Sequence, residues 1–244
     1  MTSEFTDKVV LVTGATGNLG SAVSRRFLAQ GAKVVVAGRS TDEITTFANE
    51  LGGGDNVFPV VAADLGSPAD VDALVKQIEQ RYGRIDILAH TVGGYAAGKP
   101  VHEDVQVDGM AQWEKNLALN ARPVYVTAGR VARHMVEHEI AGHMVIILAR
   151  AALKGTANNG AYNASKAFAL RIVESMSAEL RDKGIHINGI LPGTIDTPAN
   201  RRDTPNADTS KWVTVDQLVD AVTYLSSEQA SAIYGIGLEV YGRG

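Results

Sequence analysis

Short apolar runs alternate with longer amphipathic segments along the whole of this chain. The runs are rich in Val, Ile and Leu with few polar interruptions, which is typical of strands buried on both faces of a sheet. Seven of them are predicted as strands: 9–12, 34–37, 57–62, 85–89, 144–148, 185–191 and 237–240. Most segments between them have about 15 to 30 residues, enough for the crossover helices that parallel strands need. The pattern predicts an α/β fold, a Rossmann-type doubly wound parallel sheet of about seven strands with helices on both faces.

Composition favours one globular domain over residues 1–244, with 45% hydrophobic and 20% charged residues and no linker-like tract. A net charge of -4 without a dense Lys/Arg block gives no reason to expect nucleic acid or a membrane as partner. No apolar run approaches the roughly 20 residues that span a bilayer, and the polar start is not typical of a secretion signal. The absence of cysteine excludes thiolate chemistry. We therefore expect a cytoplasmic protein that acts on a small molecule.

A glycine-rich turn follows the first predicted strand. It reads Gly14-Ala-Thr-Gly17-Asn-Leu-Gly20 and leads into a helix predicted over 21–30. Glycines let the backbone approach a phosphate closely, and a helix amino terminus offers free N–H groups and a positive dipole end. The turn predicts a dinucleotide cradle, although a tight turn without a ligand has the same composition. The residues assigned to the cradle are Gly14, Thr16, Gly17, Asn18, Leu19 and Gly20.

The ends of the second and third strands indicate which dinucleotide is bound. Where an NAD site has a carboxylate for the ribose hydroxyls, this chain has Gly38-Arg39-Ser40, which leaves space and positive charge for a 2′-phosphate. Arg39 and Ser40 favour NADP(H) over NAD(H), although an exposed arginine could simply begin the next helix. Asp64, with Leu65, lies where a carboxylate can accept a hydrogen bond from the adenine amino group. Aspartate is also common at helix amino termini.

Tyr162 and Lys166 form the candidate proton-transfer pair. They lie four residues apart in Tyr162-Asn-Ala-Ser-Lys166, so on a helix both side chains face one cleft. A phenol with an unperturbed pKa of about 10 is a poor acid or base at neutral pH, and a nearby cation lowers that pKa. Such a pair could exchange a proton with an alcohol or ketone oxygen. The same spacing also arises by chance on amphipathic helices.

Several motifs occur in a fixed order: the glycine turn, Asp64, Asn120, the Tyr162/Lys166 pair and Pro192-Gly193. Together they resemble the short-chain dehydrogenase/reductase family over essentially the whole sequence. The resemblance implies that Tyr162 is the catalytic acid/base, that Lys166 lowers its pKa and holds the nicotinamide ribose, and that Asn120 bends its helix and holds a water of the proton relay. It further implies cofactor contacts by Thr91, Val92, Gly93, Pro192, Gly193, Ile195 and Thr197. It also implies a homodimer or homotetramer formed through two long helices.

Four departures from the family pattern stand out. The middle glycine of the turn comes one place early, so Asn18 stands where the family has its second glycine. His90-Thr-Val-Gly93-Gly94 replaces paired asparagines, and His90 is interpreted as a hydrogen-bonded structural histidine. The C-terminal Tyr241-Gly-Arg-Gly244 lacks the common Asp-Gly-Gly segment. Ala149 occupies the position of the serine that orients the reacting carbonyl, and loss of one such donor typically costs on the order of 10²-fold in rate.

Ala149 leaves three functions open. The first is an NADPH-dependent reductase that transfers a hydride to a small carbonyl or conjugated acceptor, with Tyr162 as proton donor. The second is a quinonoid dihydropteridine reductase, because members of that branch have a small residue here and resemble this chain over 149–156 and at positions between 191 and 212. Arg39 departs from the NADH site of that branch. The third is an NADP-binding sensor or scaffold with little turnover.

A substrate region is predicted near these residues. The irregular segment 196–214 follows a strand end and is a candidate substrate lid. Tyr95 and Trp212 could sandwich a planar ligand and Arg150 could reach a polar one, although each could equally be packing or surface charge.

One further string, His134-Met-Val-Glu137-His138, matches the H-x-x-E-H pattern of a zinc-peptidase class. No third ligand is evident in the sequence. A solvated helix face is therefore the preferred interpretation, and no metal site is predicted.

Overall fold

The seven predicted strands form one sheet in the computed structural model, which describes residues 4–96, 98–106 and 110–244. They are β1 (Val9–Thr13), β2 (Lys33–Gly38), β3 (Val57–Val61), β4 (Ile87–His90), β5 (His143–Ile147), β6 (His186–Pro192) and β7 (Gly237–Val240). All neighbours pair in parallel, in the order β3-β2-β1-β4-β5-β6-β7. The strand order reverses at β1 and β4, which is the doubly wound topology. The predicted fold class is confirmed.

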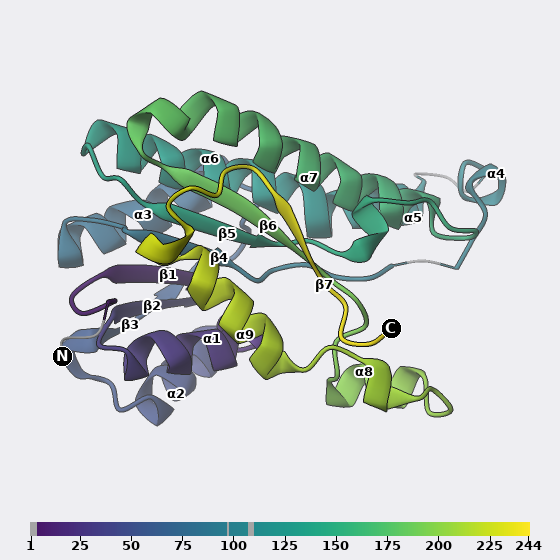
Figure 1. Ribbon diagram of the computed structural model, residues 1–244, viewed down its shortest axis with the longest axis horizontal. Helices are drawn as coiled ribbons and strands as arrows, with labels where there is room; N and C mark the ends of the chain where they lie inside the picture. The colour runs from purple at the N-terminus through teal and green to yellow at the C-terminus, as the bar shows by residue number, and fades with distance from the viewer. Residues whose placement is uncertain (1–3, 97, 107–109) are drawn as a thin grey trace.

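Two layers of helices cover the sheet (Figure 1). One face carries α3 (Pro68–Tyr82), α6 (Arg122–Glu137) and α7 (Gly160–Leu180), and the other carries α1 (Asn18–Ala29), α2 (Thr41–Glu50) and α9 (Val215–Leu225). The short helices α4 (Val101–Asp104), α5 (Ala111–Asn116) and α8 (Pro198–Asp203) lie beyond the carboxyl ends of the strands. Within the described ranges, no helix has both the length and the apolar character needed to traverse a bilayer.

Successive residues of a strand point into different helix layers. In β1, Val9 and Leu11 belong to the apolar cluster with α3, α6 and α7, whereas Val10 and Val12 belong to the cluster with α1, α2 and α9. Each of the four is at most 1% exposed. Complete burial of such a side chain stabilises the fold by about 1.5–3 kcal/mol. Because both faces are buried, the strands have continuous apolar sequences rather than alternating ones.

Helix α1 begins at Asn18, three residues earlier than the sequence predicted. Gly20 therefore lies inside the first helical turn instead of in the loop. The prediction was wrong because it took every glycine of the motif as a turn residue. At this position the glycine is needed for close packing, since a Cβ on it would overlap the Gly14 carbonyl oxygen.

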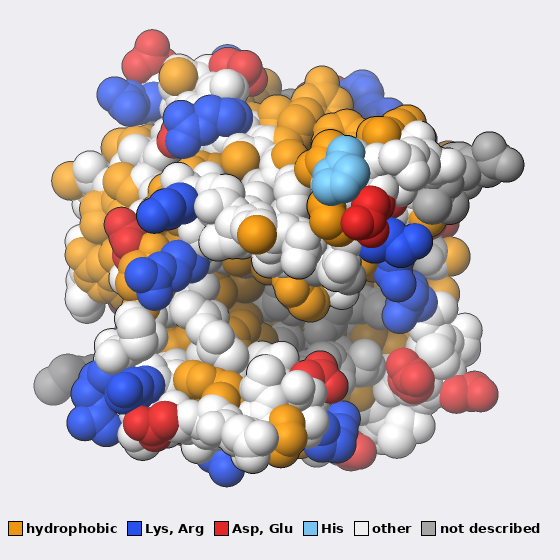
Figure 2. Space-filling model, turned by 90° about the vertical axis from the view of Figure 1, so that its right-hand side faces the viewer, with side chains coloured by type: hydrophobic (Ala, Val, Ile, Leu, Met, Phe, Trp, Pro, Cys, Tyr) orange, Lys and Arg blue, Asp and Glu red, His pale blue; other side chains and the backbone are white. Residues whose placement is uncertain are grey.

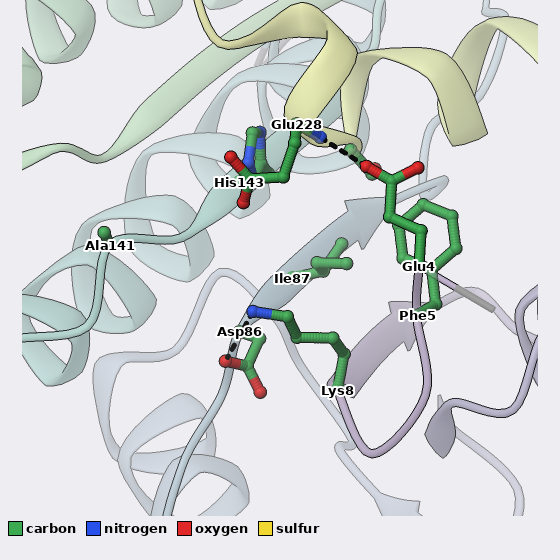
Figure 3. A pocket seen from close by; sticks show the side chains of 9 residues that line it. Glu4, Phe5, Lys8, Asp86, Ile87, Ala141, His143 and Glu228 are labelled. Atoms are coloured by element: carbon green, nitrogen blue, oxygen red, sulfur yellow. Dashed lines mark hydrogen bonds and ion pairs between the residues drawn. The ribbon is translucent and has the colours of Figure 1, made fainter. Parts of the chain in front are cut away.

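The carboxyl ends of the strands meet on one side of the molecule. Figure 2 shows that this side is hollowed between an upper and a lower part of the surface. The opposite end of the sheet is closed by the amino-terminal segment (Figure 3), where Glu4 accepts a hydrogen bond from the Glu228 N–H at 2.6 Å and Lys8 reaches Asp86 at 4.0 Å. The hollow enclosed there measures about 40 Å³, which holds only a few waters. Two much larger cavities lie at the carboxyl ends.

Candidate active site

A cavity of about 420 Å³ lies at the carboxyl ends of β1, β2, β3 and β4. Its walls come from the loops that follow these strands, so the fold brings together segments that are far apart in the sequence. They include nine residues that the sequence assigned to the cofactor: Gly14, Thr16, Gly17, Arg39, Asp64, Leu65, Thr91, Val92 and Gly93. In a parallel sheet, the crevice where the strand order reverses is the expected place for a dinucleotide.

The glycine turn after β1 leaves no room for side chains. Gly14 has φ +69°, a conformation that disfavours any other residue, and a Cβ on Gly20 would lie 2.8 Å from Thr91 Oγ1. No described side chain caps α1. The first N–H groups of the helix therefore remain available to an anion, with the positive end of the helix dipole behind them. The turn fits the pyrophosphate of a dinucleotide.

Other predicted cradle residues lie in the first turn of α1 and not in the cavity wall. Asn18 is exposed, whereas the Leu19 side chain packs into the core beside α1. Of Leu19, only the backbone can therefore face a phosphate. Because the helix starts at Asn18, the residue that replaces the family's middle glycine has an ordinary helical position. The shifted glycine spacing is accommodated without strain at that residue.

Arg39 lies at the rim of this cavity and is exposed. It makes no ion pair with any residue in the described part of the chain. Ser40 caps α2, because its hydroxyl accepts a hydrogen bond from the Glu43 N–H at 3.3 Å. Glu43 lines the same cavity, which the sequence did not indicate. This end of the cavity therefore offers one positive and one negative side chain.

The Asp64 carboxylate lines the cavity and also shapes its own loop. One oxygen, Oδ1, accepts a hydrogen bond from the Gly66 N–H at 2.7 Å. The amino terminus of α3 is capped by Ser67, which accepts from the Asp70 N–H at 3.3 Å. Asp64 is therefore not the helix cap that its residue type allowed, and its exposed carboxylate faces the cavity.

Lys166, Asn120 and the loop after β4 meet at Gly93. A Cβ on Gly93 would lie 3.0 Å from Lys166 Nζ and 3.2 Å from Asn120 Oδ1. Asn120 Oδ1 accepts a hydrogen bond from the Gly94 N–H at 3.0 Å, and its Nδ2 donates to Ser165 Oγ at 3.2 Å. Asn120 therefore ties the β4 loop to α7. It lies in a π-helical segment, Leu117–Ala121, where the resemblance implied a bend in the helix.

Burial governs the titration of the predicted proton-transfer pair. It raises the pKa of Tyr162 to about 12, with Tyr95 as a second cause. It lowers the pKa of Lys166 to about 8. The sequence led us to expect that Lys166 lowers the Tyr162 pKa, and this expectation is not met in the structure. Both groups are taken out of water, which disfavours the charged form of each, and the residue packed against Tyr162 is another phenol rather than the ammonium.

His90, the last residue of β4, is fully buried. Its Nδ1 lies 3.0 Å from Thr13 Oγ1, whereas its Nε2 has no hydrogen-bond partner among the described residues. Burial, and next the Lys166 cation, lowers the pKa of His90 to about 3. His90 is thus a neutral structural histidine as interpreted, but only one of its two ring nitrogens is hydrogen-bonded.

A second cavity, of about 620 Å³, lies on the other side of Tyr162. All four predicted substrate residues line it: Tyr95, Ala149, Arg150 and Trp212. The Tyr95 ring stands edge-on to Tyr162, with centroids 4.9 Å apart, and its hydroxyl donates to Asn159 Oδ1 at 2.8 Å. Arg150 stacks over the Tyr241 ring at 4.6 Å. Four aromatic residues, Tyr95, Tyr162, Trp212 and Tyr241, thus line this cavity.

Ala149 joins β5 to a short 3₁₀ turn and is 9% exposed. It lines the second cavity together with Tyr162, so the fold places a methyl group where the family pattern has a hydroxyl. Pro192, Gly193 and Ile195 line the same cavity. Thr197 lies outside both cavity walls and caps α8, because its Oγ1 accepts a hydrogen bond from the Asn200 N–H at 3.3 Å.

Several wall residues were not found from the sequence. Besides Glu43, the first cavity is lined by Ala118, Leu119 and Pro123, and the second by Leu148, Asn200, Asp208, Lys211 and Tyr241. Asn120 could have indicated the first group, because Ala118, Leu119 and Pro123 are its near neighbours on the same helical segment. In the second group, Asn200, Asp208 and Lys211 belong to the predicted lid segment 196–214 although they were not named singly, whereas Leu148 and Tyr241 lie outside it.

The chain matches known proteins over most of its length. A family model described as short chain dehydrogenase matches residues 8–208. An uncharacterized oxidoreductase of Staphylococcus aureus strain MRSA252 is 32% identical over 220 residues, 90% of this chain and 91% of that protein. One from Staphylococcus haemolyticus strain JCSC1435 is 28% identical over 228 residues, 93% and 94% of the two chains. A solved short-chain type dehydrogenase/reductase from Mycobacterium ulcerans has a TM-score of 0.88 at 25% identity, with 98% of this chain and 90% of that one covered.

The chain belongs to the short-chain dehydrogenase/reductase family. It is an oxidoreductase of a class that uses a nicotinamide cofactor, and the glycine turn of the first cavity fits such a cofactor.

Proposed function

We propose that this protein is an NADPH-dependent reductase that transfers a hydride to a small carbonyl or conjugated acceptor, with Tyr162 as the proton donor. One observation carries the proposal. Gly93 lines the dinucleotide cavity, Tyr162 lines the second cavity, and Lys166 lies between them, one helical turn from Tyr162 and against Gly93. A reacting acceptor held beside Tyr162 is therefore next to the cavity that suits the cofactor.

The cofactor, when bound, supplies the hydride. Gly14, Thr16, Gly17 and the amino terminus of α1 hold its pyrophosphate, while Asp64 and Leu65 face the adenine. Thr91, Val92 and Gly93 support the central part of the dinucleotide. The backbone of Pro192, Gly193 and Ile195 would position the nicotinamide, as the family resemblance implies. The resemblance adds the Thr197 hydroxyl, which caps α8 in this structure.

Tyr162 holds the proton that a reduction needs. Because the pKa of Tyr162 is raised to about 12, its phenol is protonated at neutral pH and has a proton to donate. With a pKa of about 8, Lys166 is mostly charged at pH 7, which leaves its ammonium available to the nicotinamide ribose, the second role that the family resemblance implies. The carbon of the acceptor gains the hydride and its heteroatom gains the Tyr162 proton. Asn120 fixes the β4 loop against α7, and the family resemblance implies that it holds the water through which the proton is replaced.

NADP(H) is favoured over NAD(H) because Arg39 stands at the cavity rim without a described carboxylate partner. A guanidinium in that state can donate two hydrogen bonds to a 2′-phosphate. Glu43 lies on the same wall, and its carboxylate would repel the negative 2′-phosphate. Preference for NADP(H) over NAD(H) therefore requires that Arg39 attract the 2′-phosphate more strongly than Glu43 repels it.

A quinonoid dihydropteridine-type substrate is the second proposal, and the walls of the second cavity favour it. Tyr95 and Trp212 provide aromatic surfaces for a planar ring, and Ala149 offers no hydroxyl to a carbonyl oxygen. A planar conjugated acceptor that Tyr162 protonates directly does not need that donor. An NADP-binding sensor with little turnover is the remaining alternative.

Segment 196–214 is proposed as the lid of this cavity. Arg201 forms two hydrogen bonds to the Asp196 carboxylate, at 2.6 and 2.8 Å, across the base of α8. Val213 returns to pair with Ile195, so the two ends of the segment are held to each other. Between these fixed ends, Asn200, Asp208 and Lys211 border the cavity.

Assembly into a homodimer or homotetramer is proposed through α6 and α7. Tyr125 on α6 and Phe168 on α7 are 60% and 43% exposed. Large apolar side chains on the outer faces of the two long helices are suited to burial against a second copy.

The proposed activity is tested by mixing purified protein with NADPH, or with NADH, and a panel of quinonoid dihydropterin, quinones and activated ketones. We expect NADPH oxidation with at least one acceptor, and a planar conjugated acceptor should react faster than a simple ketone. Tight NADPH binding with no oxidation across the panel would contradict a reductase and favour the sensor.

A further inference from the structure

A cluster of two histidines and a glutamate lies between α3 and α6, at the end of the sheet opposite the two cavities. His134 and His138 are four residues apart at the carboxyl end of α6, so their side chains share a face. Glu79 comes from the last turns of α3, which packs beside α6 (Figure 1). One potential ligand atom from each of the three residues lies within 4.8 Å of the other two. The third ligand that the sequence did not reveal is supplied by the neighbouring helix.

The hydrogen bonds of His138 leave its Nε2 without a proton when the ring is neutral. Nδ1 of His138 lies 2.9 Å from the backbone carbonyl oxygen of His134, which can only accept, so Nδ1 carries the ring proton. Nε2 then presents a lone pair to Glu79 Oε1, 3.1 Å away. Two unprotonated acceptors at this distance repel each other unless a proton or a metal cation lies between them. A backbone carbonyl behind the ring is also the usual partner of a metal-bound histidine.

The unpartnered ring nitrogen of His134 is a second observation that points to a bound cation. It is 3% exposed, and its Nε2 has no hydrogen-bond partner among the described residues. Its ring lies over that of His138, with centroids 4.2 Å apart. A buried ring nitrogen without a partner normally costs on the order of 1–3 kcal/mol, and a bound cation would remove that cost.

The charged side chains around the cluster balance, with Asp72, Glu79 and Glu137 against Lys76, Arg130 and Arg133. Other carboxylates at this surface are already paired, since Asp72 lies 3.2 Å from Arg130 and Glu137 lies 2.7 Å from Arg133. Glu79 has only His138 as an ion-pair partner in the described part of the chain. Lys76 lines the same surface hollow, of about 380 Å³, as Glu79, His134 and His138. The carboxyl ends of α3 and α6 both point here, and each contributes the negative end of a helix dipole.

We propose that Glu79, His134 and His138 form a binding site for one divalent cation of the Zn²⁺ class, which links α3 to α6. Two imidazole nitrogens and one carboxylate oxygen are a ligand set that suits Zn²⁺ better than Mg²⁺ or Ca²⁺. Three protein ligands leave at least one coordination position for water. The site is separate from the redox cavities and does not depend on the proposed function.

Tag-free protein is stripped with EDTA, dialysed and titrated with Co²⁺, whose visible absorption reports coordination by nitrogen and oxygen. Zn²⁺ is then added to displace it, and the melting temperature is measured with and without Zn²⁺. The variants are Glu79→Gln and His138→Ala, both at exposed positions, so that neither removes a buried side chain. His102→Ala is the matched control, because His102 is an exposed histidine beside a glutamate, Glu103, at 3.9 Å but outside the cluster.

Wild type and His102→Ala should bind one Co²⁺ per chain, release it to Zn²⁺ and melt at higher temperature with Zn²⁺. Glu79→Gln and His138→Ala should each weaken binding by more than about 100-fold, since even loss of a group behind a ligand typically costs 10–100-fold. Equal binding by wild type and both variants would overturn the site. So would a wild type that binds neither metal, because a proton shared by His138 and Glu79 would then explain the contact.

Discussion

Acidification from pH 7 to pH 5 should destabilise this protein strongly, because two of its histidines are buried in the neutral form. Burial lowers the pKa of His90 to about 3 and that of His143 to about 4, from an ordinary value of 6.5. At pH 5 the unfolded chain therefore binds a proton at each position and the folded chain does not. Protons that bind only the unfolded state shift the equilibrium toward it.

The size of the effect follows from the two pKa values. Each histidine should lower the free energy of unfolding by about 2 kcal/mol between pH 7 and pH 5, or about 4 kcal/mol together. The loss begins as the pH falls below 6.5 and continues until the pH reaches each folded pKa. His134, whose pKa is also lowered by burial, adds to it in the same direction. A typical domain is stable by only about 5–15 kcal/mol.

Urea unfolding at pH 5, 6 and 7, followed by tryptophan fluorescence in the presence of EDTA, measures this loss. His143→Gln should remove about 2 kcal/mol of the pH dependence, because it removes one of the two strongly shifted groups. Comparing each protein with itself cancels any stability cost of the substitution that does not vary with pH. His102→Ala, at an exposed position, should leave the pH dependence intact. An unfolding free energy that is constant from pH 7 to pH 5 in wild type, or unaltered pH dependence in His143→Gln, would refute the reasoning.

Three substitutions test the two cavities. Gly20→Ala forces a Cβ into the Gly14 carbonyl and should weaken NADPH binding at least about 10-fold in a fluorescence titration, whereas Gly129→Ala, in open space on α6, should not. Arg39→Ala should weaken NADPH by roughly 10- to 100-fold, the value of a charge-assisted hydrogen bond, and NADH by little; an equal loss for both would contradict the 2′-phosphate contact. Ala149→Ser should accelerate ketone reduction if a carbonyl donor is lacking, and unchanged or slower turnover would support a planar acceptor that Tyr162 protonates without help.

The sheet could be predicted because its strands are buried on both faces. Continuous Val/Ile/Leu runs of strand length, separated by helix-length segments, leave few other arrangements, and all seven runs are strands in the structure. Helix boundaries were harder to predict. The start of α1 depends on the contact between Gly20 and the Gly14 carbonyl, which exists only after the turn has folded.

Part of the candidate site could likewise be predicted from the sequence, and part could not. Residues of the glycine turn and of the strand ends could be placed together because parallel strands end at one edge. Glu43 was missed because α2 must fold back over β2 before its side chain reaches the cavity. The raised pKa of Tyr162 was missed because burial and the neighbouring Tyr95 ring are tertiary features. Glu79 was missed for the same reason, since it lies on another helix than His134 and His138.

The central claim is that Tyr162 donates the proton in an NADPH-dependent reduction. The most direct test is the rate of NADPH oxidation by Tyr162→Phe with the acceptor that wild type reduces fastest, alongside an NADPH titration of both proteins. Removal of a positioned general acid should lower kcat by about 10²-fold or more, while NADPH affinity stays within a few-fold of wild type because the pyrophosphate cradle is untouched. Turnover equal to wild type in Tyr162→Phe would contradict the claim.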